Sequence, residues 1–329
     1  MKYKSIGILM TIATMSSLIG CSVQKVSVEY EDNAIESKEV FNNNLEYAEK
    51  ELVELEEKKN IEKAKQEELE RLKAITKNVE TEIKDSLNDN TSEVSSGGLD
   101  NKKYGWGLKR GVNGALPDAG PGRSELLSKY HGYYLGNINE KVIYLTFDNG
   151  YENGNTHMIL DILKKNNVKA AFFVTTPYID ENPDIIKRMF DEGHVVGNHS
   201  TTHPSMPSLN SIDAFRKELD GCSNAYKNIT NTDMESFFRP PMGEFSVQSL
   251  SYTKELGYKS IFWSFAYKDW DVKNQPNPSE AKETIYKNIH NGEIMLLHSV
   301  SKTNTEILDE VIKTITSRGY EFKTLRDLP

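Results

Sequence analysis

The chain has 329 residues, a formal net charge of −9 and two cysteines, and 37% of its residues are hydrophobic. That length accommodates one large domain with an extension, or two modest domains. The acidic balance argues against a nucleic-acid binder, because no excess of Lys and Arg is available to neutralise phosphates. Two cysteines are too few for a disulfide framework.

The first residues have the pattern of a secretion signal. Two lysines precede an apolar run over residues 6–19, which is too short to span a bilayer comfortably. The segment Leu18-Ile19-Gly20-Cys21 is similar to the lipobox of bacterial lipoproteins, in which the cysteine receives a diacylglycerol. We therefore expect residues 1–20 to be a lipoprotein signal peptide and Cys21 to anchor the chain to the outer face of the cell membrane. An ordinary signal peptide with a chance cysteine is the alternative. Cys222 then has no partner, and we expect it to pack as a small residue in a helix.

Residues 30–96 contain neither glycine nor proline and are rich in Glu and Lys. Apolar side chains recur there at a 4-3-4-3 spacing, at Phe41, Leu45, Ala48, Leu52 and Leu55. The stripe is interrupted at Lys59 and Glu62 and then resumes. Two interpretations stay open: a solvated, partly helical spacer, or a coiled coil that self-associates or docks a protein partner. We assign residues 21–100 to an acidic helical arm and a linker that includes the flexible joint Ser95-Ser96-Gly97-Gly98.

Residues 101–329 have the aromatic, glycine and proline content of a packed domain. After an irregular lead-in over 106–134, the pattern predicts strands at 142–147, 170–175, 195–196, 237–238, 260–263, 294–297 and 320–322. Helices are predicted at 156–165, 212–229, 279–289 and 305–317, with two more capped by Asn182 and Ser246. This repeated βα order, with about seven strands, predicts a distorted (β/α) barrel, and a doubly wound sheet is the alternative.

Polar and aromatic residues stand where five of these strands end. They are Asp148 with Asn149, His199, Arg239, Asp269 with Trp270, and His298. The carboxyl ends of strands in a βα fold meet on one face, so we expect these side chains to form one site. His199 and His203 are four residues apart, and on a helical turn both imidazoles would face one ion. Two histidines suit a borderline divalent metal such as Zn, Co, Ni or Mn.

These residue types are suited to metal-assisted amide hydrolysis. Asp148 can accept a proton from an attacking water, and Arg239 can hold that carboxylate ionised and oriented. His298 is a candidate general acid, because amide cleavage must protonate a departing amine. Asp269 can fix the tautomer of His298 and favour its imidazolium form.

Five segments together resemble the motifs of the NodB-homology polysaccharide deacetylases, carbohydrate esterase family 4. They are Thr146-Phe147-Asp148-Asn149-Gly150, His199-Ser200-Thr201-Thr202-His203-Pro204, Arg239-Pro240-Pro241-Met242-Gly243, Asp269-Trp270 and Leu296-Leu297-His298-Ser299. The resemblance covers residues 104–329 and implies a NodB-type barrel. It implies that Asp148 is the general base, that His298 is the general acid, and that His199 and His203 bind the metal. Substrate contacts are expected from Pro241, Gly243, Tyr267 and Trp270, although ordinary packing would also explain the last two.

Within the family, four stretches are similar to the branch that acts on N-acetylmuramic acid in spore formers. They are Trp106-Gly107-Leu108-Lys109-Arg110 and residues 146–154, 193–199 and 297–301. The resemblance implies release of acetate from peptidoglycan glycan strands, toward muramic δ-lactam in spore cortex. The alternatives are a deacetylase of N-acetylglucosamine polymers and a catalytically weak scaffold lipoprotein at the cell surface. Acetate release from the two glycans distinguishes the first alternative. The second would be indicated by loss of Asp148 or His298, and both residues are present.

Asn149 departs from the pattern of most of the family, which carries a metal-binding Asp at this position. An Asn side chain offers only a neutral amide oxygen to a cation. We therefore expect Asn149 to be a weak third ligand, and Zn, Co or Mn to be bound less tightly than the histidine pair alone suggests.

Overall fold

The computed structural model describes residues 59, 63 and 99–329, and residues 99–329 belong to one compact unit. Cys21, the predicted signal peptide and nearly all of the acidic arm lie outside the described residues. The domain boundaries, the lipid anchor and the coiled coil therefore stay predictions. Within the described ranges, no helix is both long enough and apolar enough to cross a membrane.

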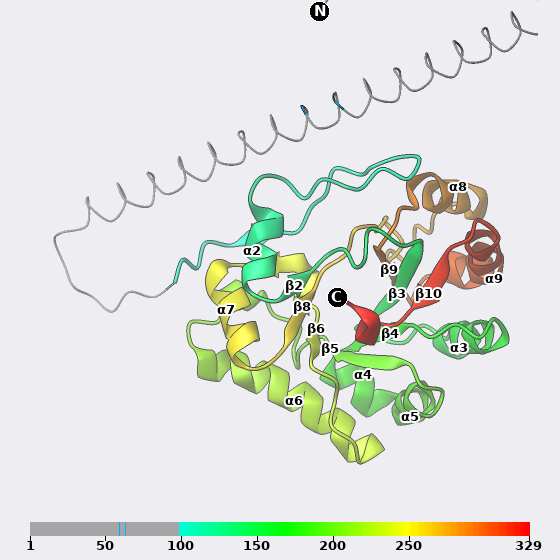
Figure 1. Cartoon of the computed structure of the whole chain (residues 1–329). Helices are drawn as coiled ribbons and strands as arrows, with labels where there is room; N and C mark the ends of the chain where they lie inside the picture. Colours follow the sequence, from blue (N-terminus) through cyan, green and yellow to red (C-terminus); the bar gives the residue numbers. More distant parts are fainter. Residues whose placement is uncertain (1–58, 60–62, 64–98) are drawn as a thin grey trace, which may run out of the picture. The chain divides into compact units, whose positions relative to one another are not determined.

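A curled parallel sheet is the centre of the described unit (Figure 1). Its strands follow the order β10-β3-β4-β5-β6-β8-β2, and β9 also pairs with β3. The bounds are β2 (Gly132–Tyr133), β3 (Val142–Asn149), β4 (Ala171–Val174), β5 (Val195–Asn198), β6 (Phe237–Phe238), β8 (Lys259–Ile261), β9 (Glu293–His298) and β10 (Glu321–Lys323). A separate antiparallel pair consists of β1 (Tyr104–Gly105) and β7 (Glu244–Phe245).

Helices surround the sheet in Figure 1, and the predicted distorted (β/α) barrel is confirmed. They are α2 (Arg123–Lys129), α3 (Thr156–Lys165), α4 (Thr176–Glu181), α5 (Pro183–Asp191), α6 (Ile212–Thr230), α7 (Val247–Glu255), α8 (Pro278–Asn288) and α9 (Lys302–Ser317). Short 3-10 turns cover η1 (Met206–Ser208), η2 (Pro241–Gly243) and η3 (Leu325–Asp327). The predicted helices agree with these bounds to within three residues at each end.

Three local predictions were wrong. The lead-in over 106–134 is not wholly irregular, because it contains α2 and β2. Helix α4 was missed; it begins after Thr175, whose hydroxyl accepts a hydrogen bond from the Tyr178 amide (3.4 Å). Asn182 precedes α5 as predicted, but its side chain donates to the Tyr178 carbonyl (2.9 Å) and does not cap that helix. Ser246 does cap α7, and the Ser249 hydroxyl oxygen accepts a hydrogen bond from the Ser246 amide (2.8 Å).

The alternation of side chains along β3 separates its core face from its inner face. Ile143, Leu145 and Phe147 belong to the large core beneath the helices. Val142 and Tyr144 belong to a second cluster inside the curl of the sheet. Successive strand residues point to opposite faces. Asp148 therefore shares the inner face, whereas Asn149 shares the core face.

We expect Gly197→Ala to destabilise the domain, because a Cβ at this position of β5 would lie 2.6 Å from the Phe173 ring and 3.1 Å from the Phe237 carbonyl oxygen. Overpacking of this kind costs about 1–3 kcal/mol. Thermal unfolding followed by circular dichroism should show a lower midpoint. Gly107→Ala is the matched control, because nothing lies within 4 Å of its added Cβ. Equal midpoints for the two variants would contradict the predicted clash.

Candidate active site

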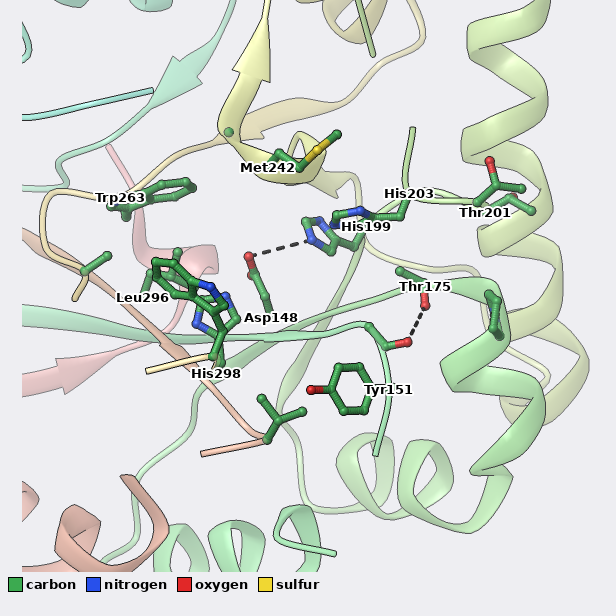
Figure 2. A pocket seen from close by; sticks show the side chains of 17 residues that line it. Asp148, Tyr151, Thr175, His199, Thr201, His203, Met242, Trp263, Leu296 and His298 are labelled. Carbon is green, nitrogen blue, oxygen red and sulfur yellow. Dashed lines mark hydrogen bonds and ion pairs between the residues drawn. The ribbon is translucent and has the colours of Figure 1, made fainter. Parts of the chain in front are cut away.

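A cavity of about 800 Å³ opens at the carboxyl end of the sheet. Figure 2 shows Asp148, His199, His203 and His298 around it, with Trp263 and Met242 at its edge. The expected gathering of strand-end residues therefore occurs. The lining residues are Asp148, Gly150, Tyr151, Thr175, Pro177, His199, Thr201, Thr202, His203, Met242, Gly243, Trp263, Ala266, Trp270, Leu296, His298 and Val300.

Asp148 forms a buried ion pair with Arg239. The guanidinium Nη1 lies 2.7 Å from Asp148 Oδ1, and Arg239 is fully buried after β6. Its Nε donates to the Ile261 carbonyl (3.0 Å), and the guanidinium lies 4.2 Å from the centroid of the Phe173 ring. Burial disfavours ionisation of Asp148, but Arg239 and the two nearby imidazoles outweigh it and lower the pKa of the carboxyl. Asp148 is thus held as a carboxylate with Oδ2 free of Arg239.

His298 is positioned by Asp269 at the end of β9. The Nδ1 of His298 lies 2.7 Å from Asp269 Oδ1, and the His298 amide donates to Asp269 Oδ2 (2.9 Å). Because a carboxylate only accepts, the ring carries its proton on Nδ1. Burial lowers the pKa of His298, but the hydrogen bond and charge of Asp269 outweigh burial and raise it. Asn304 on α9 also donates to Asp269 Oδ2 (2.6 Å), which fixes the carboxylate.

His199 and His203 lie together on a loop, not on a helical turn as predicted. Their ring centroids are 4.9 Å apart, and the backbone at Ser200 and His203 has positive φ values of 71° and 57°. Glu218 on α6 holds the loop by accepting from the Thr202 amide and hydroxyl (both 2.8 Å). The four-residue spacing correctly predicted that the two imidazoles lie close together. The predicted helical conformation of the segment was wrong, because contacts with Glu218 of α6 stabilise an irregular loop backbone.

The two imidazoles suit a divalent metal. His199 Nδ1 donates to the Arg239 carbonyl (2.8 Å), which leaves the Nε2 lone pair free and 3.7 Å from Asp148 Oδ2. Burial lowers the pKa of His199 to about 4, so the ring is neutral at pH 7, as a ligand must be. Across the described residues, no group of three or more His, Cys, Asp or Glu side chains could hold a metal ion. Asp148 is already paired with Arg239, and residue 149 is not acidic.

Asn149 is placed differently from the other predicted ligands. It is fully buried and absent from the cavity lining, and its Oδ1 accepts a hydrogen bond from the Ser299 hydroxyl (3.1 Å). Its amide nitrogen has no hydrogen-bond partner in the described part of the chain. The donor set of this site therefore consists of two neutral imidazoles, with the third predicted ligand engaged elsewhere.

The predicted substrate contacts divide into two groups. Trp270 and Gly243 line the cavity, and Trp270 is 51% exposed with its ring 5.6 Å from that of His298. Tyr267 and Pro241 are buried and absent from the lining. The Tyr267 hydroxyl donates to Asn304 Oδ1, so this residue supports the acid side of the site from behind.

Several site residues were not identified from the sequence. Asn304, Ser299, Tyr151 and Met242 contact the predicted residues or line the cavity. Trp263, which the sequence places at the end of a predicted strand, lines the cavity as that position predicts. Met242 lay inside a recognised motif, and its positive φ of 58° and 55% exposure at the rim could only come from the structure. Asn304 has no local signal, because it meets Asp269 only when α9 packs beside β9.

Comparisons with known proteins agree with this geometry. A family model described as polysaccharide deacetylase matches residues 136–261. PdaA, a peptidoglycan-N-acetylmuramic acid deacetylase of Bacillus subtilis, is 46% identical over 228 residues, which cover 69% of this chain and 86% of that protein. An uncharacterized 30.6 kDa protein of Geobacillus stearothermophilus is 48% identical over 234 residues, covering 71% and 88%. The solved structure of B. subtilis PdaA, described as a family 4 carbohydrate esterase, matches with a TM-score of 0.68 at 45% identity, covering 70% of this chain and 98% of that one.

We expect Asp269→Asn to lower the pKa of His298, because the raised value depends on the charge of this carboxylate while burial and Arg239 act in the opposite direction. The imidazolium should therefore lose its proton at a lower pH than in the wild type. NMR titration of the His298 ring in the presence of a chelator measures the change. Asp271→Asn, in the same loop, is the control and should leave the titration unaltered. An unchanged or higher pKa in Asp269→Asn would contradict this account of the pair.

Proposed function

The chain belongs to the polysaccharide deacetylases of carbohydrate esterase family 4, and from that premise we propose that it hydrolyses the acetamido group of N-acetylmuramic acid in peptidoglycan. The observation that carries the proposal is the pair of opposed, separately tuned groups in one cavity. Asp148 is kept ionised by Arg239, and Asp269 raises the pKa of His298, which favours its imidazolium form. An amide hydrolase needs such a base and such an acid at the same time. The similarity to PdaA supports the choice of sugar.

In the proposed reaction, Asp148 removes a proton from a water molecule as that water attacks the acetyl carbonyl carbon. His298 then donates its proton to the amine nitrogen as the carbon–nitrogen bond breaks, which releases acetate and leaves a free amine on the sugar. Arg239 keeps Asp148 in place, and Asp269 accepts the Nδ1 proton of His298 and favours its imidazolium form, whose second proton, on Nε2, is the one donated. A divalent metal held by His199 and His203 would polarise the carbonyl and acidify the water.

The biological setting follows from the substrate. Peptidoglycan lies outside the cytoplasmic membrane, so the enzyme acts in an extracytoplasmic compartment, and a lipid at Cys21 would tether it there. A freed amine on muramic acid is adjacent to the lactyl carboxylate, from which a δ-lactam can close. We propose this role in spore cortex, and muropeptide analysis of a deletion strain tests it by the loss of muramic δ-lactam.

We expect purified protein to release acetate from glycan strands whose muramic acids lack stem peptides. Asp148→Asn and His298→Ala should each lower kcat by about 10²- to 10⁴-fold, because each removes one proton-transfer group. Acetate quantification at saturating substrate gives the rates. His157 is an exposed histidine on α3 that is absent from the cavity lining, so His157→Gln should keep wild-type activity. Full activity in either site variant would refute the assigned mechanism. Faster release from N-acetylglucosamine oligomers would favour that sugar as the substrate, and no release from either glycan would favour a scaffold role.

We expect Asn149→Asp to tighten metal binding by about tenfold or more. The new carboxylate would be fully buried next to Asp148, and a nearby cation relieves the electrostatic cost of two buried negative charges. His203→Ala should weaken binding, because it removes one of two imidazoles. Calorimetric titration with Zn²⁺ measures both effects, and Asn139→Asp, on an exposed loop, is the control. Equal affinities for wild type and Asn149→Asp would show that residue 149 does not limit metal binding.

A further inference from the structure

The cavity has no unpaired positive charge among the residues that line it. Its lining contains neither Lys nor Arg within the described part of the chain. The two charged pairs of the site, Asp148 with Arg239 and Asp269 with His298, each sum to zero. An anionic substituent next to the reacting acetamido group would therefore need a cation from outside the lining.

Arg110 is hydrogen-bonded to one of the residues that line the cavity. Its Nη2 donates to the carbonyl oxygen of Ala266, a lining residue, at 2.5 Å. The guanidinium carbon lies 5.6 Å from the centroid of the Phe265 ring. Arg110 is exposed, and its side chain bonds to the Ala266 carbonyl, with no ion pair to a carboxylate found for it among residues 99–329. One edge of the guanidinium is thus held by the protein while its other donors stay available.

The segment that carries Arg110 is attached to further residues of the cavity lining. The Trp106 amide donates to the Gly243 carbonyl (2.8 Å), and the Trp106 indole donates to the Trp263 carbonyl (2.9 Å). Lys109 and Asp118 exchange two backbone hydrogen bonds of 2.9 Å each. In Figure 2, Trp263 lies across the cavity from His203. The lead-in therefore holds Arg110 beside the part of the cavity that includes Trp263 and Ala266, away from the metal-binding histidine.

N-acetylmuramic acid differs from N-acetylglucosamine by a lactyl ether on the carbon next to the one that bears the acetamido group. Without a stem peptide, that lactyl group ends in a free carboxylate. A guanidinium presents several N–H donors in a planar fork that matches a carboxylate. We propose that Arg110 binds the lactyl carboxylate of peptide-free muramic acid and so selects this sugar over N-acetylglucosamine. This inference rests on the proposed function and identifies a specificity residue outside the catalytic set.

A cycle of two substrates and two enzymes tests the contact. The substrates are glycan strands with free lactyl carboxylates and the same strands with each lactyl group converted to a neutral methyl amide. For the wild type, amidation should lower kcat/KM by about tenfold to a hundredfold, the range for a hydrogen bond between charged groups. For Arg110→Gln, kcat/KM should be the same for both substrates, while activity on N-acetylglucosamine oligomers should equal that of the wild type.

Arg123→Gln is the matched control, because Arg123 lies on the same segment and donates to the Gly107 carbonyl (3.3 Å). It should discriminate between the two substrates as the wild type does, and Arg110→Lys should do so in part. Circular dichroism and thermal unfolding verify that the variants fold. If Arg110→Gln discriminates as strongly as the wild type, the role of Arg110 is overturned while the proposed function stands. If the wild type releases acetate only from N-acetylglucosamine oligomers, the proposed substrate is overturned as well.

Discussion

The parallel pairing of β3 with β9 is the constraint on which the site depends. Its register places Asp148 opposite His298 at the last rung of the ladder. Each strand then brings one of the two proposed proton-transfer groups to the same edge of the sheet. The alternation along β3 turns Asp148 into the curl of the sheet and Asn149 into the core. A slip of one residue would exchange these two side chains and remove the base from the cavity.

Pairing of opposite charges stabilises the ionisable groups of the site in their buried positions. An isolated carboxylate in such a site would be neutralised by a proton. Arg239 prevents this for Asp148, and its own burial is offset by hydrogen bonds to two backbone carbonyls and by the Phe173 ring. Asp269 has a matching role for His298, with Asn304 and the His298 amide as further donors. The two pairs hold opposite protonation states in one cavity, which is the electrostatic requirement for acid–base hydrolysis.

The proposed metal site depends on fewer groups than the acid–base pairs. Two neutral imidazoles on an irregular loop offer ligands and leave open positions for water and substrate. Asn149, the residue after Asp148, has a neutral amide that accepts a hydrogen bond from Ser299 and is not part of the cavity lining. The protein therefore has a well-supported proton-transfer apparatus beside a site with few anionic ligands. The lead-in, by contrast, adds a positive charge near the same cavity through Arg110.

From its sequence alone, this protein could be assigned to a barrel of repeated βα units with Asp148, His199, Arg239, Asp269 and His298 at strand ends. Those predictions succeeded because hydrophobic runs locate strands, and strand ends in such folds share one face. Packing decided the rest. The backbone of the His199–His203 loop depends on Glu218 of another helix, and Asn304 reaches Tyr267 and Asp269 only in the folded barrel. Side-chain partners that lie far apart in the chain leave no periodic signal, so only the tertiary structure could reveal them.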